Sequence, residues 1–295
     1  MRLICVRFPE GKSKLFTLSY DDGIKQDIRL LSLMEKYGIK GTFNLNSNRF
    51  APNPTEYSPE DYIKRHLLSQ EEAVKLYSSP NAEVALHGAE HIFPTSVPSS
   101  VATMEYLEDR LNLEKIFNKI IRGCAYSYGL FNDENVNIIK TCGVAYARTI
   151  KNTYTFALPT DWLRLSPTCH HNSAELFDLT DKFINKTPDR DPYFFYVWGH
   201  SYEFDEKNNW DRIEDLFSKV CNRDDVWYCT NIEAYDYINA FNSLVYSADG
   251  SRIHNPTATD VWAMVELPVT FNEKGKMPNP ERITIKIPAG QTIKI

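Results

Sequence analysis

The sequence predicts an α/β protein whose parallel strands close into a barrel, with a small β appendage at the C-terminal end. Three observations predict this fold class. Short apolar runs alternate with segments of helical periodicity, a pattern typical of parallel sheets. The 295 residues suit one large α/β barrel with a small addition. Polar clusters of Asp and His directly follow predicted strands, as in barrels that assemble a site at one edge.

About seven strands are predicted, each a short run rich in apolar or aromatic residues and bounded by turn-forming residues. The clearest is the run 193–198, which lies between Pro192 and Gly199. The predicted strands span residues 15–18, 41–46, 83–86, 122–126, 144–147, 193–198 and 226–229, with a further extended piece at 163–168.

Helices are predicted between these strands, because apolar residues recur there at helical spacing. They cover about residues 24–34, 69–77, 173–185, 211–220 and 232–241. A longer helix after the third strand carries on one face the apolar residues Met104, Leu107 and Leu111. Terminal signals support these assignments: a capping box at Ser69 and Glu72, an N-cap at Asn132, and glycine stops at Gly38 and Gly143.

The pattern changes near residue 244. From 243–295 no helical periodicity remains, and short β-type runs are separated by Asp-Gly, Asn-Pro and Pro-rich turns. We therefore predict two parts, a barrel over residues 1–242 and a small β appendage over residues 243–295.

Composition excludes several classes of partner. The net charge is −6 and no basic run is present, which argues against a nucleic-acid or anionic-membrane partner. No apolar stretch approaches the roughly 20 residues that span a bilayer. We expect a cytoplasmic protein, because no signal peptide is visible, although a signal removed beforehand stays open. The six cysteines form no CxxC pair and are expected as free thiols, and the oligomeric state is left open.

The first polar cluster is Asp21-Asp22-Gly23, at the end of the first predicted strand. Two neighbouring carboxylates raise the pKa of one of them unless a cation neutralises the pair. An ordinary turn is the alternative, since Asp-Asp-Gly is common turn chemistry.

The second cluster is His87-Gly-Ala-Glu-His91, directly after the third predicted strand. Two imidazoles four residues apart lie on one face of a helical turn, with Cβ atoms roughly 5–6 Å apart. This spacing suits two ligands of one metal ion. The alternative is an unrelated pair of loop histidines, because HxxxH often occurs by chance.

Five segments, taken in order, resemble the motifs of the polysaccharide deacetylase (NodB-homology) family over about residues 14–241. They are Tyr20-Asp-Asp-Gly23, His87-Gly-Ala-Glu-His91, Tyr126-Ser-Tyr-Gly129, Asp161-Trp162 and Trp198-Gly-His200. The resemblance implies a distorted (β/α) barrel, a carbohydrate partner, and metal-dependent hydrolysis that removes N- or O-acetyl groups from the sugar.

Carried over by position, the resemblance implies one divalent metal ion, with zinc expected, held by Asp22, His87 and His91. It implies Asp21 as the general base for a metal-bound water and His200 as the general acid. The chemistry agrees, because two histidines and a carboxylate are a common catalytic zinc set. The unperturbed pKa of imidazole lies near neutrality, which suits a proton donor.

Other positions receive weaker roles from the resemblance. The backbone amide of Tyr128 would bind the oxyanion, and Asp161 would orient and charge the catalytic histidine. Tyr126, Trp162 and Trp198 are the remaining candidates at the substrate, with core packing as the alternative for both tryptophans.

Two departures from the family pattern stand out. Ala125 occupies the position where the third motif usually begins with an Arg that holds the catalytic Asp. Either another cation substitutes, with Arg122 or Arg148 as candidates, or Asp21 is held more loosely. Gly88 replaces a usual Ser or Thr. His170 and His171 form a separate pair, which is not expected to ligate the ion because neighbouring strand residues point to opposite faces.

Two other functions are kept beside the deacetylase. One is a metal-dependent amidohydrolase on the same scaffold, acting on a small amide or cyclic ureide. The other is a carbohydrate-binding protein with a degenerate site, which the missing arginine keeps open. A complete set of base, ligands and acid argues against the second, since binding alone needs none of them together.

Overall fold

The computed structural model describes residues 3–51, 66–267 and 280–295. Its main sheet contains β2 (Lys14–Asp21), β3 (Gly41–Leu45), β4 (Ala82–Leu86), β5 (Gly123–Ala125), β6 (Tyr146–Arg148), β7 (Cys169–His170), β8 (Tyr193–Gly199) and β9 (Val226–Tyr228). Seven of them follow the order β6-β5-β4-β3-β2-β8-β7, β9 pairs with β2, and every pair is parallel. The predicted distorted (β/α) barrel of about seven parallel strands is confirmed.

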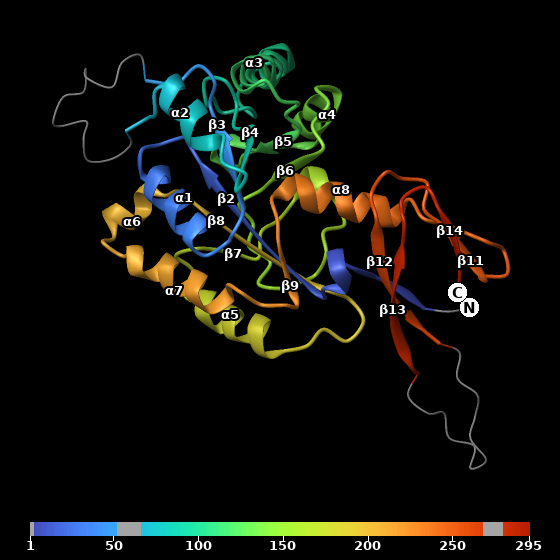
Figure 1. The fold of residues 1–295 in the computed structure, drawn as a ribbon. Helices are drawn as coiled ribbons and strands as arrows, with labels where there is room; N and C mark the ends of the chain where they lie inside the picture. The colour runs from blue at the N-terminus through green and yellow to red at the C-terminus, as the bar shows by residue number, and fades with distance from the viewer. Residues whose placement is uncertain (1–2, 52–65, 268–279) are drawn as a thin grey trace, which may run out of the picture.

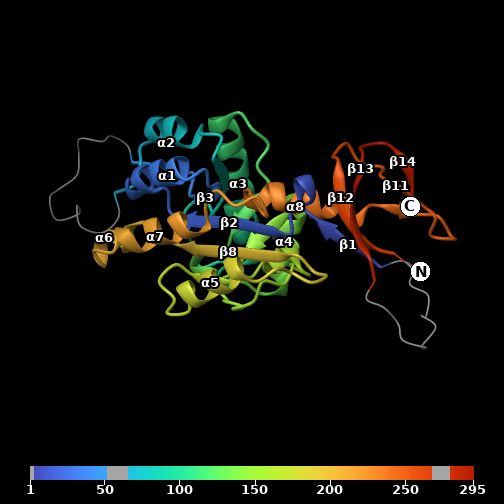
Figure 2. The same ribbon diagram turned by 60° about the horizontal axis from the view of Figure 1, so that its bottom comes forward.

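Helices cover the outside of this sheet, with α1 and α2 on one side and α5 on the other (Figure 2). They are α1 (Gln26–Lys36), α2 (Gln70–Tyr77), α3 (Ser99–Phe117), α4 (Asp133–Thr141), α5 (Leu176–Asn185), α6 (Tyr202–Glu206), α7 (Trp210–Val220) and α8 (Asn231–Asn242). The predicted caps at Ser69 and Asn132 are both present as capping boxes. Within the described residues, no helix combines the length and the apolarity needed to cross a membrane.

The buried face of α3 is not the face that carries the apolar residues noted in the sequence. Met104, Leu107 and Leu111 are exposed, whereas Glu105 and Asp109 are buried. The two acids point inward because they accept hydrogen bonds from backbone N–H groups of the neighbouring loop. The same buried face carries the apolar residues Ala102, Tyr106, Leu113 and Phe117, and its two acids support the site described below.

Alternation along β2 decides which of its side chains enter the barrel. Phe16, Leu18 and Tyr20 belong to the core beneath the helices, whereas Leu15 belongs to a second core at the base of the barrel. Because successive side chains of a strand point to opposite faces, Asp21 lies on the same face as Leu15. A carboxylate thus reaches the barrel interior at the last residue of the strand.

The remaining strands form two small antiparallel sheets. One contains β1 (Ile4–Arg7), β12 (Val261–Glu266) and β13 (Arg282–Ile287), and the other contains β10 (Val245–Tyr246), β11 (Arg252–His254) and β14 (Thr292–Lys294). Residues 4–7, which were predicted with the barrel, thus pair with β12 in the β region. These sheets lie at the end of the molecule opposite α6 (Figure 1). The predicted division at residue 242 stays a prediction.

Candidate metal centre and catalytic site

The polar residues singled out in the sequence gather at one edge of the main sheet. Asp21 is the last residue of β2 and Asp22 follows it, while His87 follows β4 and His200 follows β8. In a barrel of parallel strands, the carboxyl ends of the strands meet at one edge and build the site there. Arg148 joins this group as the last residue of β6.

Asp22, His87 and His91 form a compact group of possible metal ligands. Asp22 Oδ1 lies 3.9 Å from His87 Nε2 and 3.8 Å from His91 Nε2, and the two Nε2 atoms are 3.1 Å apart. The backbone of Asp22 and of His91 is left-handed, with φ of 83° and 56°. Such strain at non-glycine residues is typical of functional sites.

The hydrogen bonds of the two imidazoles fit a divalent ion. His87 Nδ1 donates to the carbonyl oxygen of Ala125 at 2.9 Å, so its Nε2 keeps the lone pair that a metal requires. Burial, together with neighbouring His87, lowers the pKa of His91 to about 4, which keeps that ring in its neutral, ligating form. Two imidazole nitrogens and one carboxylate are a donor set that suits zinc.

Asp109 of α3 fixes the backbone that carries His87. Its Oδ2 accepts hydrogen bonds from the N–H groups of His87 at 3.0 Å and Gly88 at 2.9 Å, and its Oδ1 accepts one from Ser47 N–H at 2.9 Å. Gly88 has φ of 83°, and a Cβ there would lie 2.6 Å from Glu105 Oε1. This close approach explains why glycine occupies a position where Ser or Thr was expected.

Arg148 is the cation that holds Asp21, in place of the arginine that the third motif lacks. Its guanidinium is fully buried and lies 2.5 Å from Asp21 Oδ2, while Asn44 Nδ2 donates to Asp21 Oδ1 at 2.8 Å. Burial alone would raise the pKa of Asp21, but Arg148, with two nearby histidines, lowers it far below its usual range. Arg122, the other candidate, instead pairs with Asp236. The sequence did contain a signal that separates the two arginines. Arg148 lies at the end of a strand, where the site is built, whereas Arg122 lies before the start of one.

His200 lies across the site from the metal ligands. Its Nε2 is 3.7 Å from Asp21 Oδ2, and its Nδ1 donates to Glu203 Oε1 at 2.8 Å. Burial would lower the pKa of His200, but the hydrogen bond to Glu203 and the charges of Asp21 and Asp22 raise it above its usual value. Sequence reasoning missed Glu203, although its position three residues after His200 suggested a contact within one helical turn.

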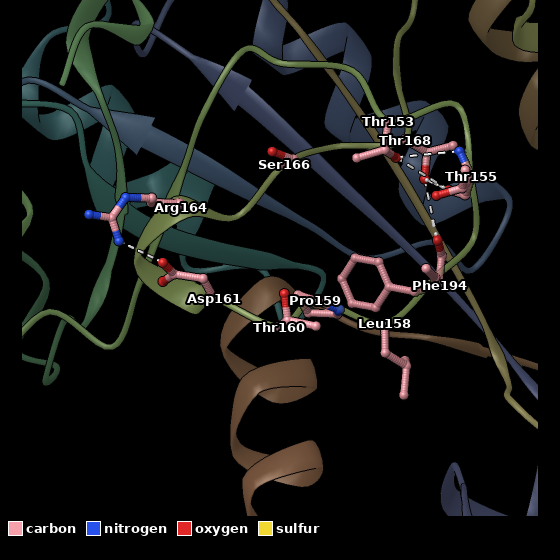
Figure 3. Close-up of a pocket in the computed structure, with 11 residues that line it drawn as sticks. Thr153, Thr155, Leu158, Pro159, Thr160, Asp161, Arg164, Ser166, Thr168 and Phe194 are labelled. Atoms are coloured by element: carbon pink, nitrogen blue, oxygen red, sulfur yellow. Dashed lines mark hydrogen bonds and ion pairs between the residues drawn. The ribbon is translucent and has the colours of Figure 1, made fainter. Parts of the chain in front are cut away.

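Asp161 is not brought to His200. Its side chain is 46% exposed and pairs with Arg164 at 2.6 Å, and its Oδ1 accepts a hydrogen bond from Leu163 N–H. The pair lies at a small pocket of about 220 Å³ lined by hydroxyl groups of the 153–168 segment (Figure 3). In the structure, Glu203 makes the contact that was expected of Asp161.

The aromatic candidates divide into packing residues and site neighbours. Tyr126 is buried and donates to the carbonyl oxygen of Leu163, and Trp162 packs against Phe194 and Tyr235 in the lower core. Neither lines the site. Trp198 is close to it, because the Arg148 guanidinium lies 4.5 Å from the centre of the Trp198 rings.

Tyr128 lies beside the metal ligands and is open to solvent. Its ring centre is 4.3 Å from that of His91, and the ring of Phe93 stacks on it at 4.1 Å with an interplanar angle of 6°. Tyr128 and Phe93 are 47% and 49% exposed. An aromatic surface therefore borders the proposed metal position.

Comparisons with known proteins agree with this fold. Residues 9–147 match the model of the family described as Polysaccharide deacetylase. A protein of Mycobacterium smegmatis, described as a candidate polysaccharide deacetylase, has a similar fold with a TM-score of 0.57 and 15% identity, over 80% of this chain and 94% of that chain. The Xyl-CE4 domain of a multidomain xylanase from the hindgut metagenome of Trinervitermes trinervoides is similar with a TM-score of 0.50 and 12% identity. That match covers 77% of this chain and 92% of that chain. A comparison with curated proteins gave no match.

Proposed function

We propose that this protein removes acetyl groups from a carbohydrate with one divalent metal ion, zinc being expected. The proposal starts from the match of residues 9–147 to the model of the polysaccharide deacetylase family, whose hydrolases cleave amide or ester bonds. One observation carries the proposal. Asp22, His87 and His91 converge on one point, with the carboxylate of Asp21 beside them and the imidazole of His200 across from it.

The metal would be held by Asp22, His87 and His91. When bound, such an ion lowers the pKa of a water molecule from 15.7 toward about 7 and polarises the acetyl carbonyl. Asp21 would accept the proton of the attacking water. It can do so because Arg148 keeps it ionised inside the barrel.

His200 would supply the second proton transfer. An amine leaves poorly unless it is protonated, so a donor must face the leaving nitrogen as the C–N bond breaks. His200 Nε2 points toward Asp21 while its Nδ1 is held by Glu203, which leaves Nε2 to donate. The backbone N–H of Tyr128 would help stabilise the oxyanion, since it lies on the turn beside His91.

The exposed pair Phe93 and Tyr128 supports a carbohydrate as the substrate. Aromatic faces provide rigid, amphipathic contact area, and the apolar face of a sugar ring can stack on them. The pair adjoins His91, so a sugar on this surface would place its acetyl group near the proposed metal position.

The proposal is tested by metal analysis of purified protein together with acetate release from acetylated chito-oligosaccharides. Asp22→Ala should abolish metal uptake, because it removes the only carboxylate among the three proposed ligands. Asp21→Asn should keep the metal and lose turnover by about 10²–10⁴-fold, as expected when a general base is removed.

Three outcomes would contradict parts of this proposal. Full activity of Asp21→Asn would exclude Asp21 as the base. Turnover of small cyclic amides without acetate release would favour the amidohydrolase. Sugar binding by the metal-loaded protein without either activity would favour a carbohydrate-binding protein.

A further inference from the structure

Glu203 is surrounded by three imidazoles at the edge of the site. Its Oε1 lies 2.8 Å from His200 Nδ1 and 3.3 Å from His170 Nε2, and its Oε2 lies 3.4 Å from His171 Nε2. Asn172 Nδ2 also donates to Oε2 at 2.6 Å. Burial would raise the pKa of Glu203, but these hydrogen bonds lower it far below its usual range, so the carboxylate stays ionised.

This cluster could be read as a second metal site, because His170, His200 and Glu203 offer three ligand atoms close together. The tautomer of His170 argues against that reading. The backbone N–H of Asn172 donates to His170 Nδ1 at 3.1 Å, so His170 Nε2 carries the hydrogen and donates it to Glu203. A metal would need a lone pair at that nitrogen. The cluster is therefore a hydrogen-bond network centred on a carboxylate.

We propose that Glu203 is the positioning residue of His200, in the role that the family resemblance assigns to Asp161. The inference rests on the proposed role of His200 as the proton donor. A carboxylate can only accept at Nδ1, so it fixes His200 in the tautomer with Nδ1–H and turns Nε2 toward the reacting group. Nε2 is the atom that faces Asp21.

The local chain holds Glu203 in place relative to His200. The backbone N–H of Glu203 donates to the carbonyl oxygen of His200 at 3.1 Å, which closes the first turn before α6. Ser201 between them donates its hydroxyl to Asp27, a buried carboxylate in the first turn of α1. The turn from His200 to Glu203 is thus closed by a backbone hydrogen bond and tied to α1 through Ser201, which keeps the imidazole and the carboxylate together.

The charges around His200 also favour its role as a proton donor. The charged or titratable groups facing His200 are Asp21 and Asp22 at the end of β2, Tyr202 and Glu203 of α6, and His170 and His171 at the end of β7. Burial lowers the pKa of His171 to about 4, so that ring is neutral and adds no positive charge beside His200. Glu203 therefore favours the protonated form of His200, which is the form that donates.

Asp161 cannot share this task in the observed arrangement. Its carboxylate is committed to Arg164 and to the backbone of its own turn. Asp161→Asn is consequently a discriminating variant, because the family pattern predicts a catalytic loss and our proposal predicts none. Glu206→Gln is a matched control, since Glu206 is on the same helix, loses the same charge and is exposed.

The first experiment compares Glu203→Gln with both controls in the metal-loaded protein, by measuring kcat, KM and metal content across pH. Glu203→Gln should lower kcat about 10–100-fold, with KM and metal content unchanged, as is typical when an orienting partner is lost. The alkaline limb of its pH profile should move to lower pH, because His200 then loses its proton more easily. Asp161→Asn and Glu206→Gln should match the wild type.

A second experiment measures the tautomer and the pKa of His200 without relying on activity. NMR of protein labelled with ¹⁵N-histidine, with His200 assigned by His200→Asn, gives its tautomer and its pKa. We expect one tautomer with Nδ1–H in the wild type, and mixed tautomers with a lowered pKa in Glu203→Gln. An unchanged His200 signal in Glu203→Gln, or a shift in Asp161→Asn instead, would overturn the proposal. If the wild type releases no acetate, the proposed function fails, and the NMR result still decides the role of Glu203.

Discussion

At the scale of single residues, Asp21 remains ionised inside the barrel because Arg148 lies against it. The guanidinium is buried between this carboxylate and the rings of Trp198. A buried carboxylate without such a partner would take up a proton and could no longer act as a base. The sequence reduced the search to two arginines, and position at a strand end separates them.

Arg148→Gln should therefore abolish turnover while leaving the metal in place. Without the guanidinium the pKa of Asp21 rises, so kcat should fall about 10²-fold or more, which acetate release measures. Removing one partner of a buried pair also costs about 3–5 kcal/mol of stability, so thermal melting is followed in parallel. Arg148→Lys, which keeps a charge, should recover part of both losses.

Arg122→Gln is the matched control for this substitution. Arg122 pairs with Asp236 near the surface, so its loss should change neither kcat nor the melting temperature appreciably. Equal activity of Arg148→Gln and the wild type would show that another group keeps Asp21 ionised.

At the scale of elements, α2 and α4 show where sequence patterns succeed, and α3 shows where they fail. Capping boxes at Ser69 and Asn132 were predictable, because all their partners lie within one turn of chain. The burial of Glu105 and Asp109 in α3 was not predictable, because the backbone amides that turn these acids inward lie in a loop outside the helix. Apolar periodicity cannot reveal an acid that is buried for its hydrogen bonds.

Asp109→Asn should weaken metal binding although Asp109 touches no proposed ligand atom. An amide cannot accept on both sides, so at least one of the N–H groups of Ser47, His87 and Gly88 loses its partner. The loop that aims His87 should loosen, and metal affinity should fall about 10–100-fold in a metal titration.

The neighbouring Glu108→Gln provides the control for that titration. Glu108 is half-buried and accepts a hydrogen bond from the Asn48 side chain rather than from the loop that carries His87, so metal affinity should not change. Unchanged affinity in Asp109→Asn would mean that the loop is held by other contacts.

At the scale of the whole molecule, the two ends of the barrel have different tasks. The proposed site occupies the carboxyl ends of the strands, where residues serve chemistry, and the opposite end serves stability. At that opposite end Glu83 is half-buried, accepting hydrogen bonds from Tyr146 Oη at 2.6 Å, Thr42 Oγ1 at 2.8 Å and Ile232 N–H at 2.9 Å. Strand ends were predictable from local patterns. The pairing of β1 with β12 was not, because it joins opposite ends of the chain.

Glu83 should make the whole molecule less stable as pH rises through the acidic range. Burial outweighs its hydrogen bonds and raises the pKa of Glu83 from 4.5 to about 7. At a pH between these two pKa values, Glu83 has lost its proton in the unfolded chain but keeps it in the folded chain. The free energy of unfolding therefore falls, by about 3 kcal/mol when the transition is complete.

Glu83→Gln isolates this contribution, because the amide is neutral at every pH. Its oxygen can accept from Thr42 and Ile232 while its NH2 group faces the Tyr146 hydroxyl, so the fold should persist. Denaturant unfolding between pH 5 and 8 should give a flatter curve for Glu83→Gln than for the wild type. Exposed Glu71→Gln should follow the wild type, and metal affinity should be equal in all three proteins. Parallel curves for Glu83→Gln and the wild type would show that a group other than Glu83 causes the pH dependence of stability. A changed metal affinity would show that the two ends of the barrel are coupled.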